Sequence, residues 1–372
     1  MSIFFILSGR TPLWTRSKFS HQSLTIRKHS APHFASLGFV FASGICTLGR
    51  MLRIIALLAL AGSAFAGQTE YIFLVTGDGI RHQEVFGGLD PMLVEDSEKA
   101  KKASGIESLS ELRKRYWAGT PQERREKLMP FFWKTLSKHG MIYGNRALGS
   151  AVNCRNPHWF SYPGYAEILN GEPLPKITSN DAVFSPRETV LEFIRRELKL
   201  KQTEVAAFGA WRVFNWITMS KEDTIFCNAG YERVPPDLSN PKMEMWNDLQ
   251  FEMMSPWDTV RHDAPTLGLA LEFIRAHKPR VVYLALGETD DWAHDRRYDR
   301  VAQSIEYFDE ALRRLWTLLQ STEPYSGKST LIITTDHGRG RTLEDWTSHG
   351  KDVPGADETW LAIFGPDVPS KG

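Results

Sequence analysis

The chain contains 372 residues, and its 45 Lys and Arg against 44 Asp and Glu give a formal net charge of +1. This length is enough for one large α/β domain or two small ones. The balanced charge excludes a strongly basic protein of the kind that binds nucleic acids through clustered Lys and Arg.

The first 66 residues differ in composition from the rest of the chain. Residues 1–50 hold six Lys or Arg and no Asp or Glu. At Met51 a second start appears, with one basic residue, an apolar run from Ile54 to Ala61 and the small-residue pattern Ala64-Phe65-Ala66. This order is typical of a secretory signal peptide that is cleaved after Ala66, and the apolar run is too short to span a membrane.

We therefore expect a mis-called upstream extension, a signal peptide and a single mature metallo-hydrolase domain, at residues 1–50, 51–66 and 67–372. The mature protein is expected to be exported to the periplasm or the extracellular space, without a transmembrane anchor. As an alternative, residues 1–50 form a basic targeting arm, because an acid-free segment with Arg and Ser resembles an organelle transit peptide. Without residues 1–66 the acidic side chains outnumber the basic ones, so no nucleic-acid-binding surface is expected.

Two cysteines remain in the mature segment, Cys154 and Cys227. In an exported protein they can form a disulfide, but two unpaired buried thiols are the competing interpretation. The sequence leaves both open, and it also makes no prediction of the oligomeric state.

Apolar, strand-like runs alternate with helical patterns along the mature segment. A short run from Tyr71 to Val75 ends in the loop sequence "TGDG", and the charged stretch from Glu95 to Lys127 is expected to be a helical excursion from the core. Apolar residues spaced by four predict a helix over residues 190–198, before the run "EVAAFGA".

The second half repeats this alternation. Asp263 is expected to cap a helix that has Pro265 in its first turn. The run "VVYLALGETD" follows as another strand that ends in polar residues. A long amphipathic helix then leads into "TLIITTDHG", and its apolar face consists of Val301, Ile305, Phe308, Leu312, Leu315 and Leu319.

Strands that alternate with helices of this length predict an α/β fold, with a mostly parallel sheet between layers of helices. In such sheets functional groups gather at the carboxyl ends of the strands. Three of the predicted strand ends carry carboxylates, those of Asp78, Asp290 and Asp336.

The pair Asp336-His337 in "TTDHG" has two interpretations. It is either a polar turn that closes a buried strand or a pair of adjacent metal ligands. Further candidates are Asp290 and His294, which are four residues apart and share one face of a helix, and His349 in a Gly-rich loop. Carboxylate and imidazole donors suit Zn²⁺ and related divalent ions, so these residues predict two metal sites.

A candidate nucleophile lies in "NPHWFSYPGYAEILNG", where Ser161 precedes a segment that can begin a helix. A serine at the start of a helix is most often a simple cap. The same position would also direct backbone N–H groups toward an anion such as phosphate, which is the functional interpretation.

Taken in order, "GDG", "FSYPGYAEILNG", "ETDDWAH", "TTDHG" and "SHG" resemble the motifs of the alkaline phosphatase superfamily, especially its phosphodiesterase and nucleotide pyrophosphatase branch. The resemblance spans residues 71–365 and implies an alkaline-phosphatase-like fold. It also implies two divalent ions, Zn²⁺ by ligand type, although Mn²⁺ accepts the same donors.

The resemblance also implies a role for each residue. Asp78, Asp336 and His337 would hold one ion, and Ser161 would contact this ion as the nucleophile. Asp290, His294 and His349 would hold the second ion. Asn180 lies near the position at which the diesterase branch carries an Asn that donates to a phosphoryl oxygen, although an Asn in "SND" is also a common turn residue.

Two departures from related families refine this expectation. Sulfatases of the superfamily carry a C/S-x-P-x-R signature, and here Tyr165 occupies the position of the Arg. Phosphomonoesterases usually add an Arg clamp, for which Arg212 is a candidate, and stacking on Trp211 or Trp216 is the competing interpretation.

The sequence thus predicts an exported two-metal phosphoesterase that acts on a small phosphorylated substrate through a phosphoseryl intermediate and prefers diesters to monoesters. The alternatives are a phosphomonoesterase or a sulfatase-like hydrolase of the same superfamily, and a catalytically inactive member that binds a ligand.

Overall fold

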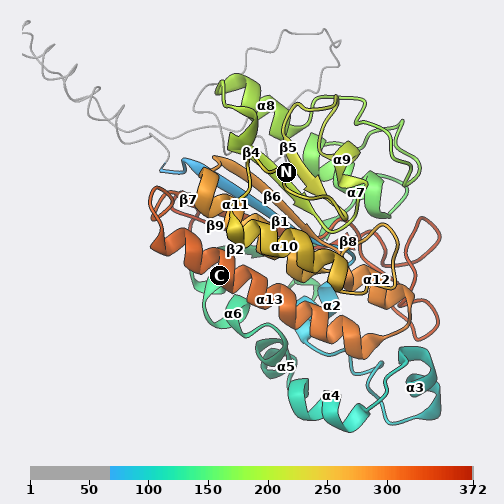
Figure 1. Ribbon diagram of the computed structural model, residues 1–372. Coiled ribbons are helices and arrows are strands. Elements are labelled where there is room, and N and C mark those ends of the chain that lie inside the picture. The colour runs from blue at the N-terminus through green and yellow to red at the C-terminus, as the bar shows by residue number, and fades with distance from the viewer. Residues whose placement is uncertain (1–67, 371–372) are drawn as a thin grey trace, which may run out of the picture. The chain divides into compact units, whose positions relative to one another are not determined.

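The computed structural model describes residues 68–370, which are coloured in Figure 1. The predicted upstream extension and signal peptide lie outside the described residues. Within the described part of the chain, no helix combines the length and the apolar character that crossing a membrane requires.

A seven-stranded sheet is the centre of the fold, with the order β2-β9-β7-β1-β6-β4-β5. β5, β4, β6, β1 and β7 run parallel, whereas β9 is antiparallel to both β7 and β2. The predicted mostly parallel sheet is therefore confirmed. The strands are β1 (Tyr71–Gly77), β2 (Gly140–Tyr143), β4 (Val205–Gly209), β5 (Phe226–Ala229), β6 (Val281–Leu286), β7 (Ser329–Thr334) and β9 (Leu361–Phe364), and β3 (Val152–Asn153) pairs separately with β8 (Glu358–Thr359).

Helices cover both faces of the sheet, and α10, α11 and α13 are seen in front of it in Figure 1. The helices are α2 (His82–Gly87), α3 (Glu98–Ser104), α4 (Leu109–Tyr116), α5 (Pro121–Leu128), α6 (Pro130–Lys134), α7 (Ser161–Asn170), α8 (Val190–Glu197), α9 (Phe214–Ile217), α10 (Pro241–Glu252), α11 (Asp263–His277), α12 (Glu288–His294) and α13 (Tyr298–Ser321), with short 3₁₀ turns at Leu136–Lys138, Arg146–Leu148 and Gln202–Glu204.

Alternation of side chains along the strands builds two hydrophobic cores, one on each face. In β1, Phe73 and Val75 join the core under α11 and α13, whereas Leu74 joins the core under α7, α8 and α9. All six residues of the predicted apolar face of α13 are buried. The central strands are thus buried on both sides, as parallel strands require.

The predicted excursion over Glu95 to Lys127 is also confirmed, since it consists of α3, α4 and α5. Each of these helices begins with a Ser or Thr cap, and Thr120 forms a capping box with Glu123. These local signals start the helices independently of the sheet.

Two predicted details are wrong. Asp263 is not a cap but the first residue of α11, and its carboxylate instead accepts from the N–H groups of Gly287 (2.8 Å) and Glu288 (3.3 Å) at the start of α12. The helix predicted over residues 190–198 ends at Glu197, and Leu198 is exposed. Both helix ends differ from the prediction by one residue, and for Asp263 the contact with α12 accounts for its side chain not acting as a cap of α11.

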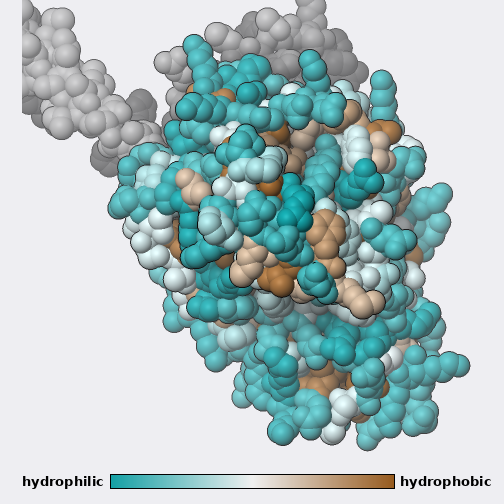
Figure 2. Space-filling view, in the orientation of Figure 1, coloured by the Kyte–Doolittle hydropathy of each residue, from teal (hydrophilic) through white to brown (hydrophobic). Residues whose placement is uncertain are grey.

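Hydrophilic side chains predominate on the face shown in Figure 2, and the hydrophobic ones form small, separate patches. The exposed large hydrophobic residues include Met245, Phe251 and Met254, which lie in α10 or just after it. Scattered apolar residues of this kind are normal on a surface that faces water.

Gly268 in α11 packs directly against the indole of Trp246 in α10, where an added Cβ would clash with the ring. We therefore expect Gly268→Ala to lower the free energy of unfolding by about 1–3 kcal/mol, although Ala favours helices. Gly87 in α2 is the matched control, because a Cβ there meets nothing within 4 Å. Chemical denaturation of both variants checks this, and equal effects would contradict it.

Candidate metal centre

The candidate ligands come from the ends of three neighbouring strands. β7, β1 and β6 lie side by side and parallel at the middle of the sheet. Thr76 pairs with Thr334, so Asp78 and Asp336, each two residues further on, leave the sheet next to each other. Asp290 follows β6 in the first turn of α12. The parallel register thus brings together three carboxylates from distant parts of the chain.

We define the first ligand group as Asp78, Asp336 and His337. His337 Nε2 lies 3.3 Å from Asp78 Oδ1 and 3.4 Å from Asp336 Oδ2. All three residues are buried, and His337 is completely inaccessible. The three ligand atoms all lie within 4.8 Å of one another.

These atoms fit a divalent cation. Asp78 Oδ1, Asp336 Oδ2 and His337 Nε2 are all buried without a hydrogen-bond partner. His337 Nδ1 lies 2.9 Å from the carbonyl oxygen of Gly338, which makes Nδ1 the protonated nitrogen and leaves a lone pair on Nε2. Ligand atoms about 2.0–2.1 Å from a tetrahedral Zn²⁺ lie about 3.3–3.4 Å from one another, so the observed separations suit such an ion.

The electrostatics of the first ligand group also favour a cation. Burial and the neighbouring charge of Asp78 raise the pKa of Asp336 to about 8. Burial lowers the pKa of His337, but the charges of Asp336 and Asp78 outweigh it and raise this pKa to about 9. Without an ion, the group therefore takes up protons, which a divalent cation would displace.

We define the second ligand group as Asp290, His294 and His349. His294 Nε2 lies 3.1 Å from Asp290 Oδ2 and 3.0 Å from His349 Nε2. Asp290 and His294 share one face of α12, as their spacing predicts. Burial and the nearby His337 lower the pKa of both His294 and His349, so both imidazoles are neutral and offer a lone pair near pH 7.

The two ligand groups are adjacent. Asp290 Oδ1 lies 3.7 Å from His337 Nε2, and the rings of His337 and His349 are 4.1 Å apart, centroid to centroid. Two-metal hydrolases hold their ions about 3.5–4 Å apart, a separation that neighbouring groups of this kind permit.

Ser161 lies on the helix that packs against the first ligand group. It is the first residue of α7 and is buried, while Phe160 holds the cap position without a side-chain hydrogen bond. The simple-cap interpretation is therefore wrong. One turn further on, Gly164 packs so closely against Asp336 that a Cβ would clash with its carbonyl, and Tyr165 donates to Asp78 Oδ2 at 2.9 Å. Ser161 shares this face of the helix.

The loops around Ser161 connect it to the other candidates. Asn180 Oδ1 accepts from the N–H group of Tyr162 at 2.9 Å, which places the amide beside the start of α7. Trp159 has a φ of 52°, and its carbonyl accepts from the N–H group of Gly350, next to His349. A non-glycine residue in this left-handed region is strained by about 1–3 kcal/mol, a feature common at functional sites.

The remaining candidates lie apart from these contacts. The guanidinium of Arg212 is exposed and lies 5.9 Å from the ring centroid of Trp216, which favours the stacking interpretation over a clamp. Cys154 and Cys227 are both free thiols, so the structure favours the unpaired alternative. Cys154 Sγ donates to the carbonyl oxygen of Asp336 at 3.0 Å.

Sequence analysis did not identify two buried residues that contact the ligands. From the sequence, Tyr165 is notable only because it occupies the position of the sulfatase Arg, but its hydroxyl donates to Asp78. Arg339, two residues after His337, donates to Asp290. A signal was present for Arg339, because a charged side chain between Gly338 and Gly340, directly after a metal-ligand motif, suggests a buried ion pair.

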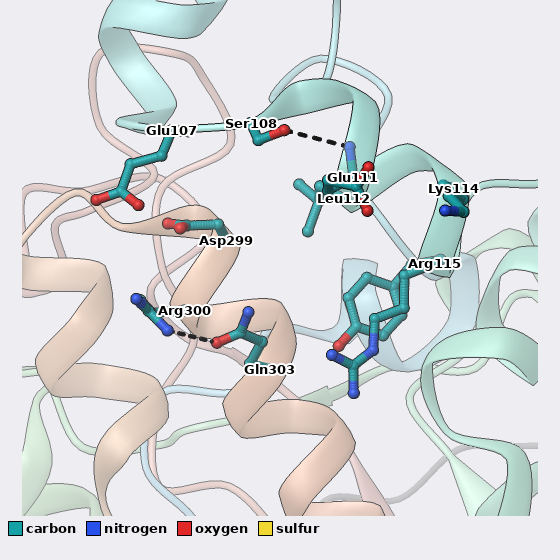
Figure 3. A pocket seen from close by; sticks show the side chains of 10 residues that line it. Glu107, Ser108, Glu111, Leu112, Lys114, Arg115, Asp299, Arg300 and Gln303 are labelled. Atoms are coloured by element: carbon teal, nitrogen blue, oxygen red, sulfur yellow. Dashed lines mark hydrogen bonds between the residues drawn. The ribbon is translucent and has the colours of Figure 1, made fainter.

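A separate cavity of about 490 Å³ lies between α4 and the first turns of α13 (Figure 3). Arg115 lines its α4 side, and Arg300 and Gln303 line its α13 side. None of its lining residues belongs to either ligand group, so this cavity is not part of the candidate metal centre.

A family model matches the part of the chain that carries most of the candidate ligands. Residues 263–354 match the model of a family described as the Metalloenzyme superfamily. This segment contains Asp290, His294, Asp336, His337 and His349, but neither Asp78 nor Ser161. No curated protein matches the sequence significantly.

Solved structures with a similar arrangement include an alkaline phosphatase superfamily protein from Vibrio parahaemolyticus, with 12% identity and a TM-score of 0.46 over 82% of this chain and 62% of that one. Phosphonoacetate hydrolase from Sinorhizobium meliloti is 15% identical, with a TM-score of 0.43 over 74% and 57%. Murine ectonucleotide pyrophosphatase/phosphodiesterase 5 is 15% identical, with a TM-score of 0.42 over 72% and 57%.

This chain thus spans only about three fifths of the length of these proteins. At such scores and identities the likeness says nothing about the substrate of this chain. The match over residues 263–354 bears out the metal-ligand part of the predicted resemblance, because these residues are similar to a metalloenzyme superfamily.

Proposed function

We propose that this protein is a two-metal phosphoesterase that hydrolyses small phosphate esters, with diesters preferred over monoesters. The observation that carries the proposal is the adjacency of two ligand groups, the first of which packs against Gly164 and Tyr165 of α7, the helix that begins with Ser161. Zn²⁺ is the preferred ion by ligand type, and Mn²⁺ is the alternative.

In the proposed reaction Ser161 is the nucleophile. Its hydroxyl gives a proton to water, Oγ forms a bond to phosphorus, and the bond between phosphorus and the leaving-group oxygen breaks, so that this oxygen keeps the electron pair and takes up a proton from water. A water molecule then attacks phosphorus, the bond between phosphorus and Oγ breaks, the phosphate product leaves, and a proton of the attacking water restores the Ser161 hydroxyl. When bound, the two ions supply positive charge that favours the Ser161 alkoxide and stabilises the phosphoryl and leaving-group oxygens.

Asn180 is proposed to orient the phosphoryl group. Its Oδ1 atom accepts from Tyr162 N–H, so the amide is held beside Ser161 and its NH₂ group is the part available to a phosphoryl oxygen. A hydrogen bond to a charged group contributes about 1.5–3 kcal/mol.

Two features bear on the alternatives. Tyr165, at the Arg position of the sulfatase signature, donates to Asp78, which disfavours a sulfatase-like activity. Stacking of Arg212 on Trp216 disfavours the proposed clamp of a phosphomonoesterase. A catalytically inactive, ligand-binding member of the superfamily is the alternative from another class. We also propose export, on the signal-peptide pattern of residues 51–66.

Metal binding should stabilise the protein. Because the ligand atoms of the first group lack partners without an ion, Zn²⁺ at about 100 times its Kd should raise the free energy of unfolding by about 2.7 kcal/mol. Thermal unfolding with and without Zn²⁺ checks this. Asp336→Asn should lose most of the gain, whereas exposed Asp352→Asn should keep it. If neither Zn²⁺ nor Mn²⁺ changed the thermal unfolding midpoint of the wild-type protein, the metal centre would be refuted.

Loss of the Ser161 hydroxyl should abolish turnover without releasing metal. We expect Ser161→Ala to reduce hydrolysis of bis-p-nitrophenyl phosphate by on the order of 10³-fold or more. Metal analysis should show unchanged content, and exposed Ser110→Ala is the control.

Assays with p-nitrophenyl phosphate and p-nitrophenyl sulfate compare ester classes, and turnover of the sulfate above both phosphates would favour the sulfatase alternative. Metal bound without turnover of any ester would favour the inactive member.

Removing the amide donor of Asn180 should weaken catalysis more modestly. Asn180→Asp keeps the acceptor for Tyr162 N–H but removes the NH₂ group, so kcat/KM for the diester should fall by about 10–100-fold with metal content unchanged. Asn180→Ala should lose at least as much. Wild-type kcat/KM in Asn180→Asp would exclude the proposed contact.

A further inference from the structure

Arg339 is an arginine buried inside the candidate metal centre. It follows His337 by two residues, and only 2% of it is exposed. The guanidinium of arginine stays protonated in proteins, so Arg339 brings a positive charge into the centre. A buried arginine of this kind needs partners that offset its desolvation.

Its partners belong to the second ligand group and its supporting loop. Nη2 donates to Asp290 Oδ1 and, at 3.1 Å, to the carbonyl oxygen of Asp290. Nη1 donates to the carbonyl oxygen of Thr347, two residues before His349. One side chain therefore connects the segment after β7, the start of α12 and the loop that carries His349.

This contact distinguishes the two oxygens of Asp290. Oδ1 accepts from Arg339, whereas Oδ2 lies 3.1 Å from His294 Nε2. Arg339 thus holds Oδ1, which also lies 3.8 Å from His349 Nε2, and so fixes the carboxylate with Oδ2 beside His294. A contact of this kind orients a metal ligand and commonly affects metal affinity by about 10–100-fold.

The environment of Arg339 argues against direct contact with a substrate. Its Nε atom is buried without a partner and faces the backbone of Gly79, where a Cβ would lie 2.9 Å from Nε and 2.8 Å from Asp290 Oδ1. Gly79, with a φ of 58°, has no side chain, and this leaves room for the guanidinium. Enclosed in this way, Arg339 can act only through Asp290 and the His349 loop.

Charge gives a second reason for its presence. Asp78, Asp290 and Asp336 are three buried carboxylates that repel one another without a cation. Arg339 supplies a permanent positive charge at the boundary of the two ligand groups. It is therefore placed to keep the second ligand group assembled before an ion arrives.

We propose that Arg339 is a positioning residue that holds Asp290 and the His349 loop in place for the second metal ion. This inference rests on the proposed metal centre and concerns binding of one of its two ions. The first ligand group does not depend on Arg339 in this proposal.

The test is titration of the purified, full-length, metal-free protein with Zn²⁺, by calorimetry and metal analysis. We expect wild type to bind two ions, and Arg339→Gln to bind the first ion normally and the second about 10–100-fold more weakly. Its binding profile should resemble that of His294→Ala, which removes a ligand of the second group, and not that of Asp336→Asn.

Two further variants guard against misinterpretation. Arg339→Lys keeps the positive charge but cannot donate to Asp290 and to the Thr347 carbonyl through two separate nitrogen atoms. It should therefore bind the second ion more tightly than Arg339→Gln does, and it tests the site if Arg339→Gln does not fold. Arg341→Gln is the matched control, because this arginine is about half exposed and pairs with Glu358. It should bind both ions as wild type does.

The outcomes separate this inference from the proposed function. If Arg339→Gln and Arg339→Lys bind the second ion as tightly as wild type, or weaken both ions equally, the positioning role is wrong. If wild type itself binds fewer than two ions, the two-metal centre fails, and the positioning role fails with it. A loss confined to the second ion, which Arg339→Lys partly restores, supports the proposal.

Discussion

The structure depends on one unfavourable arrangement, the burial of three carboxylates at the ends of neighbouring strands. Asp78, Asp290 and Asp336 lie within a region where water cannot screen their charges. The pKa of Asp336 rises for this reason. Their burial is stable only with compensating positive charge, of which Arg339 supplies part. The same lack of positive charge explains why the ligand atoms suit a divalent ion.

The rest of the fold holds these groups in place. Parallel pairing of β7, β1 and β6 fixes where each carboxylate leaves the sheet. The close approach of α7 is possible because Gly164 has no side chain between the helix and Asp336. The backbone contact between Trp159 and Gly350 joins the loop before Ser161 to the loop of His349. The candidate nucleophile Ser161 and the candidate ligands are thus positioned by the same few contacts.

Much of this arrangement follows from local patterns. The alternation of strands and helices predicts the parallel sheet, and the spacing of Asp290 and His294 predicts a shared helix face. Asp263 shows the limit of such patterns, since a good cap residue by sequence caps the neighbouring helix instead. Tyr165 and Arg339 were not identified because their partners, Asp78 and Asp290, are distant in the sequence.

By itself, the sequence determined the class of the fold and the chemical types of the candidate ligands, because periodicity and donor type are local properties. Only the tertiary structure decided how close the candidate ligands lie to one another, that Asp290 Oδ1 accepts from Arg339, and that Arg212 stacks on Trp216. These outcomes depend on strand register and on the packing of loops. Both are set by contacts between segments that are far apart in the chain.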